Sequence, residues 1–445
     1  MMVEAFARIN GFPQLEQWQV DAVNLPLAAG GCGMRRLRQI CETAYIGAWC
    51  QTAPHVASVT GARADPGAAG VPPEIQRAAR QLWEEQRVDV QESLRSTWGE
   101  LATRGCEKAQ KALTSVANTQ RVADFRASLD TVLRGVLDSG SALADDEGRA
   151  SPGTSDWLVA SPRTLAFVMP DAAYCTSLRA RLRLDLAHVS ATCIYRTHTT
   201  HRTCGAELTR NADHAHGCCR APVLARHHAI RDLWCRLCRE AGCSADTEQI
   251  VYELGRRRPR QQVNPDAVEP AARIDGENGG EDVVADVRAL QGPAAPAVYT
   301  DVVVTHPVNC HHGAWTATAR GVAARREERK KYADYTPNPG GRPVCFVPLA
   351  FETFGRWGPA AVTELRRLAR LRVDADRASP LEPAAAFRSV LTRWRQQVAV
   401  ALQRGNFEVY AASTRPSAPA AAQVHAQAHP GLGNTRSADF SCVHF

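Results

Sequence analysis

Hydrophobic residues recur at helical spacing through the first third of the chain. Within residues 35–51, Leu37, Ile40, Cys41, Ala44 and Ala48 fall at the i, i+3, i+4 and i+7 spacing of one helix face. After a linker rich in Ala, Gly and Pro at residues 61–72, three amphipathic stretches follow at residues 73–97, 99–117 and 119–138. The pattern predicts a mostly helical bundle over residues 1–140.

A polar stretch at residues 139–155 interrupts this pattern before another predicted helix at residues 172–186. The stretch contains the triplet Ala144-Asp145-Asp146, which is followed by Glu147-Gly148-Arg149. Paired aspartates in a polymerase would lie in a hairpin between apolar strands, and no such strands flank this triplet. We therefore interpret the stretch as a solvated loop.

The second half of the chain alternates between helical and β-type patterns. Helices are predicted at residues 226–242, 358–371 and 384–404, with a strand at residues 244–253 and another from residue 345. Two further β-branched runs, residues 283–287 and 299–305, each contain an Asp, and a basic helix follows at residues 325–332. An Arg-, Pro- and Gly-rich inserted loop at residues 255–282 and a disordered tail from about residue 413 are expected. The overall prediction is an α+β protein with a small, mixed-sheet α/β domain.

Composition limits the function classes only loosely. At 445 residues with 44% hydrophobic content, the chain is long enough for two or three domains with sizeable cores. The net charge of +7 permits a polyanionic partner but does not require one. The first residues lack a signal-peptide pattern and no apolar run could span a bilayer, so we expect a protein without membrane association whose 15 cysteines are reduced.

Residues 193–219 are dense in metal-ligand types: Cys193, His198, His201, Cys204, His214, His216, Cys218 and Cys219. Three of them, Cys204, His214 and Cys218, have a spacing compatible with three of four tetrahedral zinc ligands. Cys193 is the first candidate for the fourth ligand and His201 the second. Core packing explains such a group poorly, so we predict a structural zinc knuckle. The pair Cys235 and Cys238, with Cys243 nearby, lies on the apolar face of a predicted helix, where packing explains the thiols.

The β-type runs contain the candidate catalytic carboxylates, Asp286 and Asp301. Aspartates on adjacent strands can hold a divalent cation such as Mg²⁺ or Mn²⁺ through oxygen ligands. Lys331, on the basic helix that follows, could steady an attacking water or the charge that develops on a phosphate. This is the layout of a metal-dependent nuclease. On spacing alone, the alternative of two edge-strand aspartates beside a solvated basic helix remains open.

The order of these motifs resembles the C-terminal part of non-LTR retrotransposon polyproteins that carry a restriction-like endonuclease. The resemblance covers about residues 20–410 and rests on matched segments: the Gly-rich element from Leu25 to Arg35, the knuckle end Ala212-Asp213-His214-Ala215-His216-Gly217-Cys218, Arg226-His227-His228, the strand residue Glu248, Val284-Ala285-Asp286, Asp301-Val302-Val303-Val304, Glu328-Arg329-Lys330-Lys331-Tyr332, and the most specific stretch, Phe346 to Gly355.

The resemblance implies a restriction-like DNA endonuclease in which Asp286 and Asp301 ligate magnesium, Glu248 supports the metal and Lys331 orients water. It also implies that Arg226, His227, Arg325 and Tyr332 line the side that faces DNA, that the knuckle helps to seat the duplex, and that no polymerase palm is present.

Three departures from the family pattern bear on activity. Arg202 stands where the first knuckle Cys often lies, Val284 replaces a Pro, and Glu328 replaces the first Lys of the helix motif. A carboxylate at position 328 could enter the metal site or leave the centre inactive.

The leading hypothesis is therefore a zinc-knuckle endonuclease module that acts on DNA in the nucleus. Element RNA is a second expected partner. An inactive remnant that only binds nucleic acid and an unrelated zinc-stabilised scaffold are the alternatives. The predicted organisation is a helical post-polymerase tail at residues 1–140, a linker and helix at 141–190, the knuckle at 191–225, the endonuclease domain at 226–375, a C-terminal helix at 376–412 and the tail at 413–445.

Overall fold

The computed structural model describes residues 2–35, 37, 40–60, 71–148, 151–186, 191–196, 202–218, 223–251, 254–256, 284–292, 295–311, 314–337, 345–376 and 380–414. The candidate ligand His201, most of the predicted loop at 255–282 and the predicted tail from residue 415 lie outside the described residues.

A four-stranded mixed sheet forms the centre of the second half of the chain. The strands are β1 (Ser244–Ile250), β3 (Val284–Leu290), β4 (Val298–Thr305) and β8 (Cys345–Glu352), in the order β1-β3-β4-β8. The first two pairings are antiparallel and the β4–β8 pairing is parallel. Parallel neighbours need a crossover connection, and α12 (Val322–Asp334) lies within it. The predicted α+β architecture with a mixed sheet is confirmed at this level.

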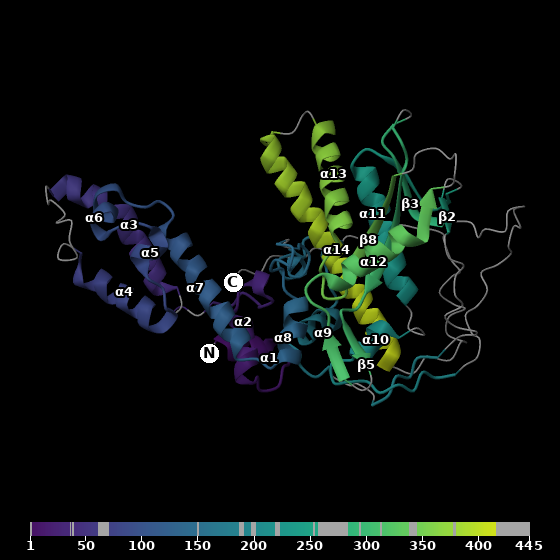
Figure 1. The fold of residues 1–445 in the computed structure, drawn as a ribbon, viewed down its shortest axis with the longest axis horizontal. Helices are drawn as coiled ribbons and strands as arrows, with labels where there is room; N and C mark the ends of the chain where they lie inside the picture. Colours follow the sequence, from purple (N-terminus) through teal and green to yellow (C-terminus); the bar gives the residue numbers. More distant parts are fainter. Residues whose placement is uncertain are drawn as a thin grey trace, which may run out of the picture.

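The two faces of the sheet are covered by different helices (Figure 1). One face packs against α11 (Val223–Glu240), α13 (Pro359–Ala375) and α14 (Pro383–Thr414). The shared core on this face includes Trp234, Val287, Val302, Leu349, Leu365 and Trp394. Helix α12 packs on β4 and β8. Because side chains alternate along a strand, Asp301 points away from the face to which Val302 contributes.

Two short two-stranded sheets accompany the main sheet. Strand β2 (Leu254–Arg256) pairs with β7 (Tyr335–Pro337), and β5 (Val308–His311) pairs with β6 (Ala314–Ala317). Strand β7 follows α12 directly in the chain, and β5 and β6 form a hairpin.

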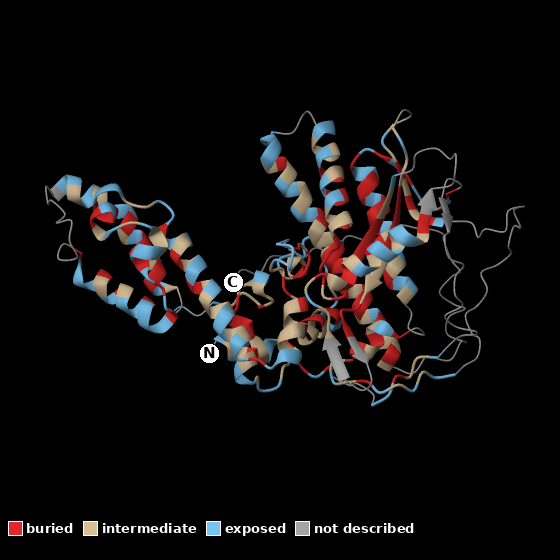
Figure 2. Ribbon diagram, viewed as in Figure 1, coloured by how far each residue is buried: buried red, intermediate tan, exposed pale blue. Residues whose placement is uncertain are grey.

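The N-terminal helices form two units rather than the single predicted bundle. Helices α3 (Cys41–Thr60), α4 (Pro73–Gln86), α5 (Val90–Leu94), α6 (Trp98–Arg104) and α7 (Ala109–Ala127) enclose a separate core and project from the rest of the molecule (Figure 1). Figure 2 shows buried residues only along the inner sides of these helices, whereas the sheet region is densely buried. Helices α1 (Met2–Ile9) and α2 (Gln17–Asn24) belong to a different core with Leu182 and Leu184, beside α9 (Asp171–Arg181).

Several predicted helix boundaries were wrong for identifiable reasons. The predicted helix at residues 73–97 ends at Gln86, because Arg87 adopts a left-handed conformation with φ 53°. A new helix then starts after Asp89, whose side chain accepts a hydrogen bond from the Glu92 N–H. Thr97 and Glu100 form a reciprocal capping box at the start of α6. At the other end of the chain, α14 continues to Thr414, about ten residues beyond its predicted end.

No helix within the described residues has the length and apolar character needed to cross a bilayer.

Two buried carboxylates cap the helices around the sheet. Glu352, at the end of β8, accepts a hydrogen bond from the Ala324 N–H in the first turn of α12 at 3.1 Å. Glu328, within α12, accepts one from the Ala360 N–H at the start of α13 at 3.0 Å. Each carboxylate satisfies a backbone donor that has no partner inside its own helix and lies at the positive end of the helix dipole. Together they fix the position of α12 relative to β8 and α13.

Glu352 makes stability depend on pH. Its side chain is fully buried, one oxygen accepts no hydrogen bond within the described residues, and burial raises the pKa from 4.5 to about 7. The folded state therefore holds the proton more tightly than the unfolded state. The resulting stabilisation is complete below pH 4.5 and is lost as the pH rises through 7.

We expect this group alone to lower the free energy of unfolding by about 2 kcal/mol between pH 5.5 and pH 8. Glu352→Gln removes the titration, so the difference between the two pH values should shrink by that amount in urea unfolding measurements. Glu382→Gln is the matched control, because Glu382 also caps a helix N-terminus but is exposed. An unchanged difference in Glu352→Gln would contradict the prediction.

Candidate functional site

Three candidate carboxylates occupy one row across three neighbouring strands. The β3–β4 register pairs Val287 with Thr300, which places Asp286 opposite Asp301 at the next position. The β1–β3 register pairs Thr247 with Val287 and Gln249 with Ala285, which places Glu248 opposite Asp286. We call Glu248, Asp286 and Asp301 the carboxylate row.

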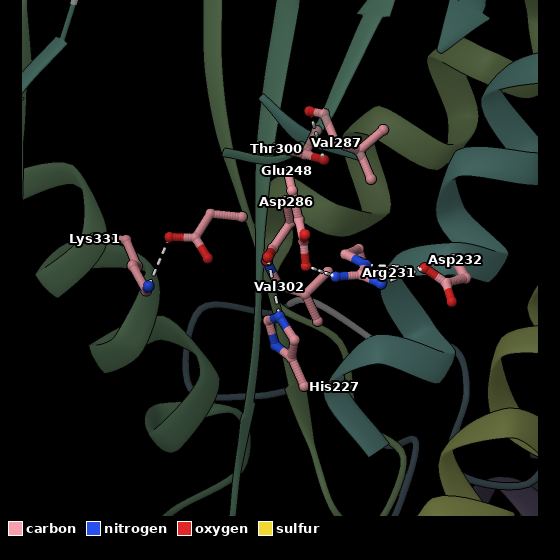
Figure 3. Close-up of polar contacts among 10 residues, drawn as sticks. His227, Arg231, Asp232, Glu248, Asp286, Val287, Thr300, Val302 and Lys331 are labelled. Carbon is pink, nitrogen blue, oxygen red and sulfur yellow. Dashed lines mark hydrogen bonds and ion pairs between the residues drawn. The ribbon is translucent and has the colours of Figure 1, made fainter. Parts of the chain in front are cut away.

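Asp286 lies where β3 and β4 begin to separate. The described pairing of these strands ends at Val287 and Thr300, and just beyond it the Val302 N–H donates to Asp286 Oδ2 at 2.5 Å. The other oxygen, Oδ1, lies 2.9 Å from His227 Nε2, near the start of α11 (Figure 3). Burial alone would raise the pKa of Asp286, but the hydrogen bond and charge of His227 and the Val302 N–H outweigh it and lower the pKa. These contacts hold the carboxylate in its charged form.

Lys331 reaches the row from α12 on the opposite side from His227 (Figure 3). Its Nζ lies 2.6 Å from Asp301 Oδ2, and 9% of the Asp301 side chain is exposed. Burial raises the pKa of Asp301, and the neighbouring Asp286 raises it further, against the opposing charge of Lys331. The two aspartates also interact through their side chains. The structure thus brings together Asp286, Asp301 and Lys331.

Glu248 shares the row but points elsewhere. Its backbone is in the left-handed region, with φ 55°, a conformation that is uncommon for a residue with a side chain and that often occurs at functional sites. Its carboxylate forms an ion pair with Arg231 of α11, and 61% of the side chain is exposed (Figure 3). Among the described residues, the carboxylate oxygens of Glu248, Asp286 and Asp301 do not all lie within 4.8 Å of one another. Glu248 therefore does not converge on the aspartates in this conformation.

Of the four residues expected to face DNA, the two arginines point into the protein, whereas His227 and Tyr332 are partly exposed. Arg226 was predicted on that surface, but it is 2% exposed and its Nη1 donates to Asn406 of α14 at 3.0 Å. A Cβ at Gly405 would lie 2.6 Å from Arg226 Cγ, so α14 needs glycine where the arginine passes. Burial lowers the pKa of Arg226 to about 10. The prediction for Arg226 is wrong because its position falls on the apolar stripe of α11.

Arg325 also points inward. Its guanidinium forms an ion pair with Asp145, and 16% of the arginine side chain and 5% of the aspartate side chain are exposed. The loop around Asp145 exists as predicted, but this carboxylate is not solvated, because it docks the loop onto α12. Tyr332 is 49% exposed, and its ring lies edge-on to Phe346 at 6.1 Å. Of the four residues, Tyr332 and the partly exposed His227 remain accessible near the row.

The Cys/His region forms a compact four-residue group. The ligand atoms of Cys193, Cys204, His214 and Cys218 all lie within 4.8 Å of one another. Cys193 and Cys204 sit on facing segments, because the Cys193 N–H donates to Ala206 O and the Gly205 N–H to Cys193 O. His214 lies on the short helix α10 (Asp213–Gly217), and Cys218 follows it directly. Three sulfurs and one imidazole suit a tetrahedral metal such as zinc, and Cys193 is the fourth member, as the first choice from sequence predicted.

The protonation of this group is consistent with metal binding. Burial lowers the pKa of His214, which favours the neutral imidazole that coordinates metals. Burial raises the pKa of Cys193, so in the absence of a cation the thiol form is favoured there, and a bound cation reverses this preference. The group packs in a small core with Leu208, Val409 and Tyr410, which joins it to the end of α14.

A buried polar network that the sequence reasoning missed connects this group to the sheet. Asp213, the neighbour of His214, accepts two hydrogen bonds from Arg183 at 2.9 and 2.6 Å. It also lies 3.3 Å from Nε2 of His306, which follows β4, while His306 Nδ1 lies 2.6 Å from the Thr353 hydroxyl. The sequence does place an acid, Asp213, directly before the candidate ligand His214. Carboxylates close to metal ligands often orient them.

The second cysteine group is part of the hydrophobic core. Cys235, Cys238 and Cys243 are all buried in the cluster that contains Trp234 and Val287. Among the described residues, these thiols do not belong to a group with metal-ligand spacing. Packing therefore accounts for them.

Comparison with known proteins returned no family model that matches the chain and no curated protein that matches its sequence. Function is therefore inferred from the geometry of the carboxylate row and of the Cys/His group.

Proposed function

We propose that this chain is a metal-dependent DNA endonuclease module of a retrotransposon-derived protein, with the Cys/His group as a structural zinc knuckle. The observation that carries the proposal is the carboxylate row, with Lys331 bound to Asp301. The order of the described elements supports it as well: an antiparallel β1-β3-β4 arrangement followed by a helix and the parallel strand β8 is compatible with a restriction-like nuclease core.

The residues present fit a divalent cation. Asp286 and Asp301 are two hard oxygen donors on adjacent strands, and each carboxylate influences the ionisation of the other. Repulsion between two such charges is relieved by a cation with oxygen-ligand preference, such as Mg²⁺ or Mn²⁺. A bound cation would polarise the phosphoryl oxygen and make a bound water more acidic. Glu248 could join this pair only after its side chain leaves Arg231.

The surrounding side chains have separate roles in this proposal. His227 and the Val302 N–H orient Asp286, which limits the directions in which its oxygens can bind a ligand. Lys331 Nζ lies beside Asp301, where it can orient an attacking water or balance charge on the phosphate. Tyr332, half exposed next to Lys331, is placed to contact the DNA. The knuckle would help to seat the duplex, and action in the nucleus and contact with element RNA belong to the same proposal.

Nicking of supercoiled plasmid tests the proposal. We expect the purified full chain to convert supercoiled DNA to open circles in Mg²⁺ or Mn²⁺ and to leave it intact in EDTA. Asp232→Asn is a matched control, because this exposed acid contacts Arg231 outside the row; it should cut as the unchanged chain does. Cutting that persists in EDTA, or a folded chain that does not cut in either metal, would overturn the proposal.

One observation favours a second candidate, a remnant that binds nucleic acid without cutting it. The resemblance places a Lys where this chain has Glu328, and that carboxylate caps α13 instead of entering the row. Only one cation of the helix motif, Lys331, therefore contacts the row. Retained DNA binding without metal-dependent nicking is the result that this candidate requires.

A further inference from the structure

Helix α12 has two chemically different faces. The inward face buries Ala323, Ala324 and Glu328. The opposite face exposes three cations, Arg326, Arg329 and Lys330. Positions three and four apart lie on the same side of a helix, so these three side chains form one continuous cationic surface, which we call the α12 outer face.

The cations of this face differ from the other arginines around the row in how they are paired. Arg325 is bound to Asp145 and Arg231 to Glu248, both within the protein. In the part of the chain that the structure describes, neither Arg329 nor Lys330 forms an ion pair with a carboxylate. Arg326 has a 3.4 Å contact with Glu327 and is 53% exposed, and exposed pairs of this kind contribute little. The outer face therefore presents positive charge to solvent.

The face lies on the side of α12 away from the carboxylate row. Lys330 is the chain neighbour of Lys331, whose Nζ contacts Asp301 from the other side of the helix. A polyanion that lies along the outer face would run past the C-terminal end of α12, where Tyr332 is half exposed.

We propose that the α12 outer face binds the sugar-phosphate backbone of duplex DNA. This inference rests on the proposed function for the identity of the polyanion. It assigns the phosphate contacts to Arg326, Arg329 and Lys330, in place of the inward-facing Arg226 and Arg325. Contacts of this kind provide affinity and orientation without reading sequence.

The test is binding of a fluorescent duplex by the full chain in Ca²⁺ at several salt concentrations. The double variant Arg329→Ala with Lys330→Ala should weaken binding about tenfold, and the slope of log K against log salt should fall by about 2, since each lost phosphate contact removes about 0.9. Lys108→Ala with Lys111→Ala is the matched control, because both lysines are exposed on the distant helical arm. The control should bind as the unchanged chain does, and circular dichroism should show that both variants are folded.

The outcomes separate this inference from the proposed function. Normal DNA binding by the α12 variant, or an equal loss in the control, would overturn the inference. DNA that is bound through α12 but never cut would overturn the nuclease function and leave the binding face intact. A chain that does not bind DNA at all would overturn both.

Discussion

Replacing Asp301 with Asn should lower metal-dependent nicking by about a thousandfold or more, the loss expected when a metal site that stabilises the transition state by several kcal/mol is disabled. Asp301 is the residue on which the site depends most, because it contacts both Lys331 and Asp286. Asn has nearly the same shape, so the buried position stays filled. It lacks the negative charge that pairs with Lys331 and that, in the proposed mechanism, would hold a divalent cation.

The control for this variant is Asp246→Asn, an acid on β1 whose side chain is 58% exposed. It should nick at the rate of the unchanged chain. Duplex binding in Ca²⁺, measured on the same preparations, should persist in Asp301→Asn because the α12 outer face is untouched. Equal nicking rates for Asp301→Asn and the unchanged chain would remove Asp301 from the mechanism.

The adjacency of Asp286 and Asp301 could be predicted because the signal is local. Each aspartate lies in a short run of β-branched residues, and period-two alternation places it on one face of a strand. Lys331 followed from helical spacing in the next segment. What the pattern could not supply is register: Glu248 lies in the same row, yet its left-handed backbone and Arg231 turn it away. Both depend on tertiary contacts that no single segment specifies.

The arginines show why charge alone predicts surface position poorly. Arg226 lies four residues before Ile230 and seven before Leu233, which are both buried, so the periodicity of α11 already placed it on the apolar stripe. That signal was in the sequence and outweighs the charge. Arg325 carried no such signal, because its partner Asp145 is 180 residues away. Glu328 is similar: its role as a cap depends on where α13 begins in space.

The helix boundaries in the N-terminal arm also include one that a local sequence motif signals and one that no motif signals. The capping box at Thr97 and Glu100 follows a recognisable Ser/Thr-x-x-Glu pattern and marks the start of α6. No sequence signal marks the end of α4 at Gln86. Arg87 adopts the left-handed backbone conformation that glycine usually provides after a helix. In this region the predicted helices began within one residue of α4 and α6, but they missed the starts of α5, of α7 and of a further helix at Thr131–Ser139.

Cys204→Ser should abolish stoichiometric zinc binding and destabilise the region around α10. Cys204 Sγ lies 3.4 Å from His214 Nε2 inside the four-residue group, so serine removes one of four ligands with little steric change. Loss of an outer hydrogen-bonding partner already costs about 10- to 100-fold in metal affinity, and loss of a ligand should cost more. Because metal binding supplies folding energy to such small cores, the contacts of Val409 and Tyr410 with this group should weaken as well.

Zinc content by elemental analysis and hydrogen exchange of residues 202–218 measure the two effects. Cys345→Ser, at an exposed thiol on β8, is the control and should keep about one zinc per chain. Asp213→Asn distinguishes the loss of a ligand from the loss of a residue that positions a ligand. It keeps all four ligands but weakens the hydrogen bonds from Arg183. It should retain zinc with lower affinity, whereas Cys204→Ser should retain none. An unchanged chain without zinc, or equal zinc content in Cys204→Ser and Cys345→Ser, would show that the group does not bind the metal.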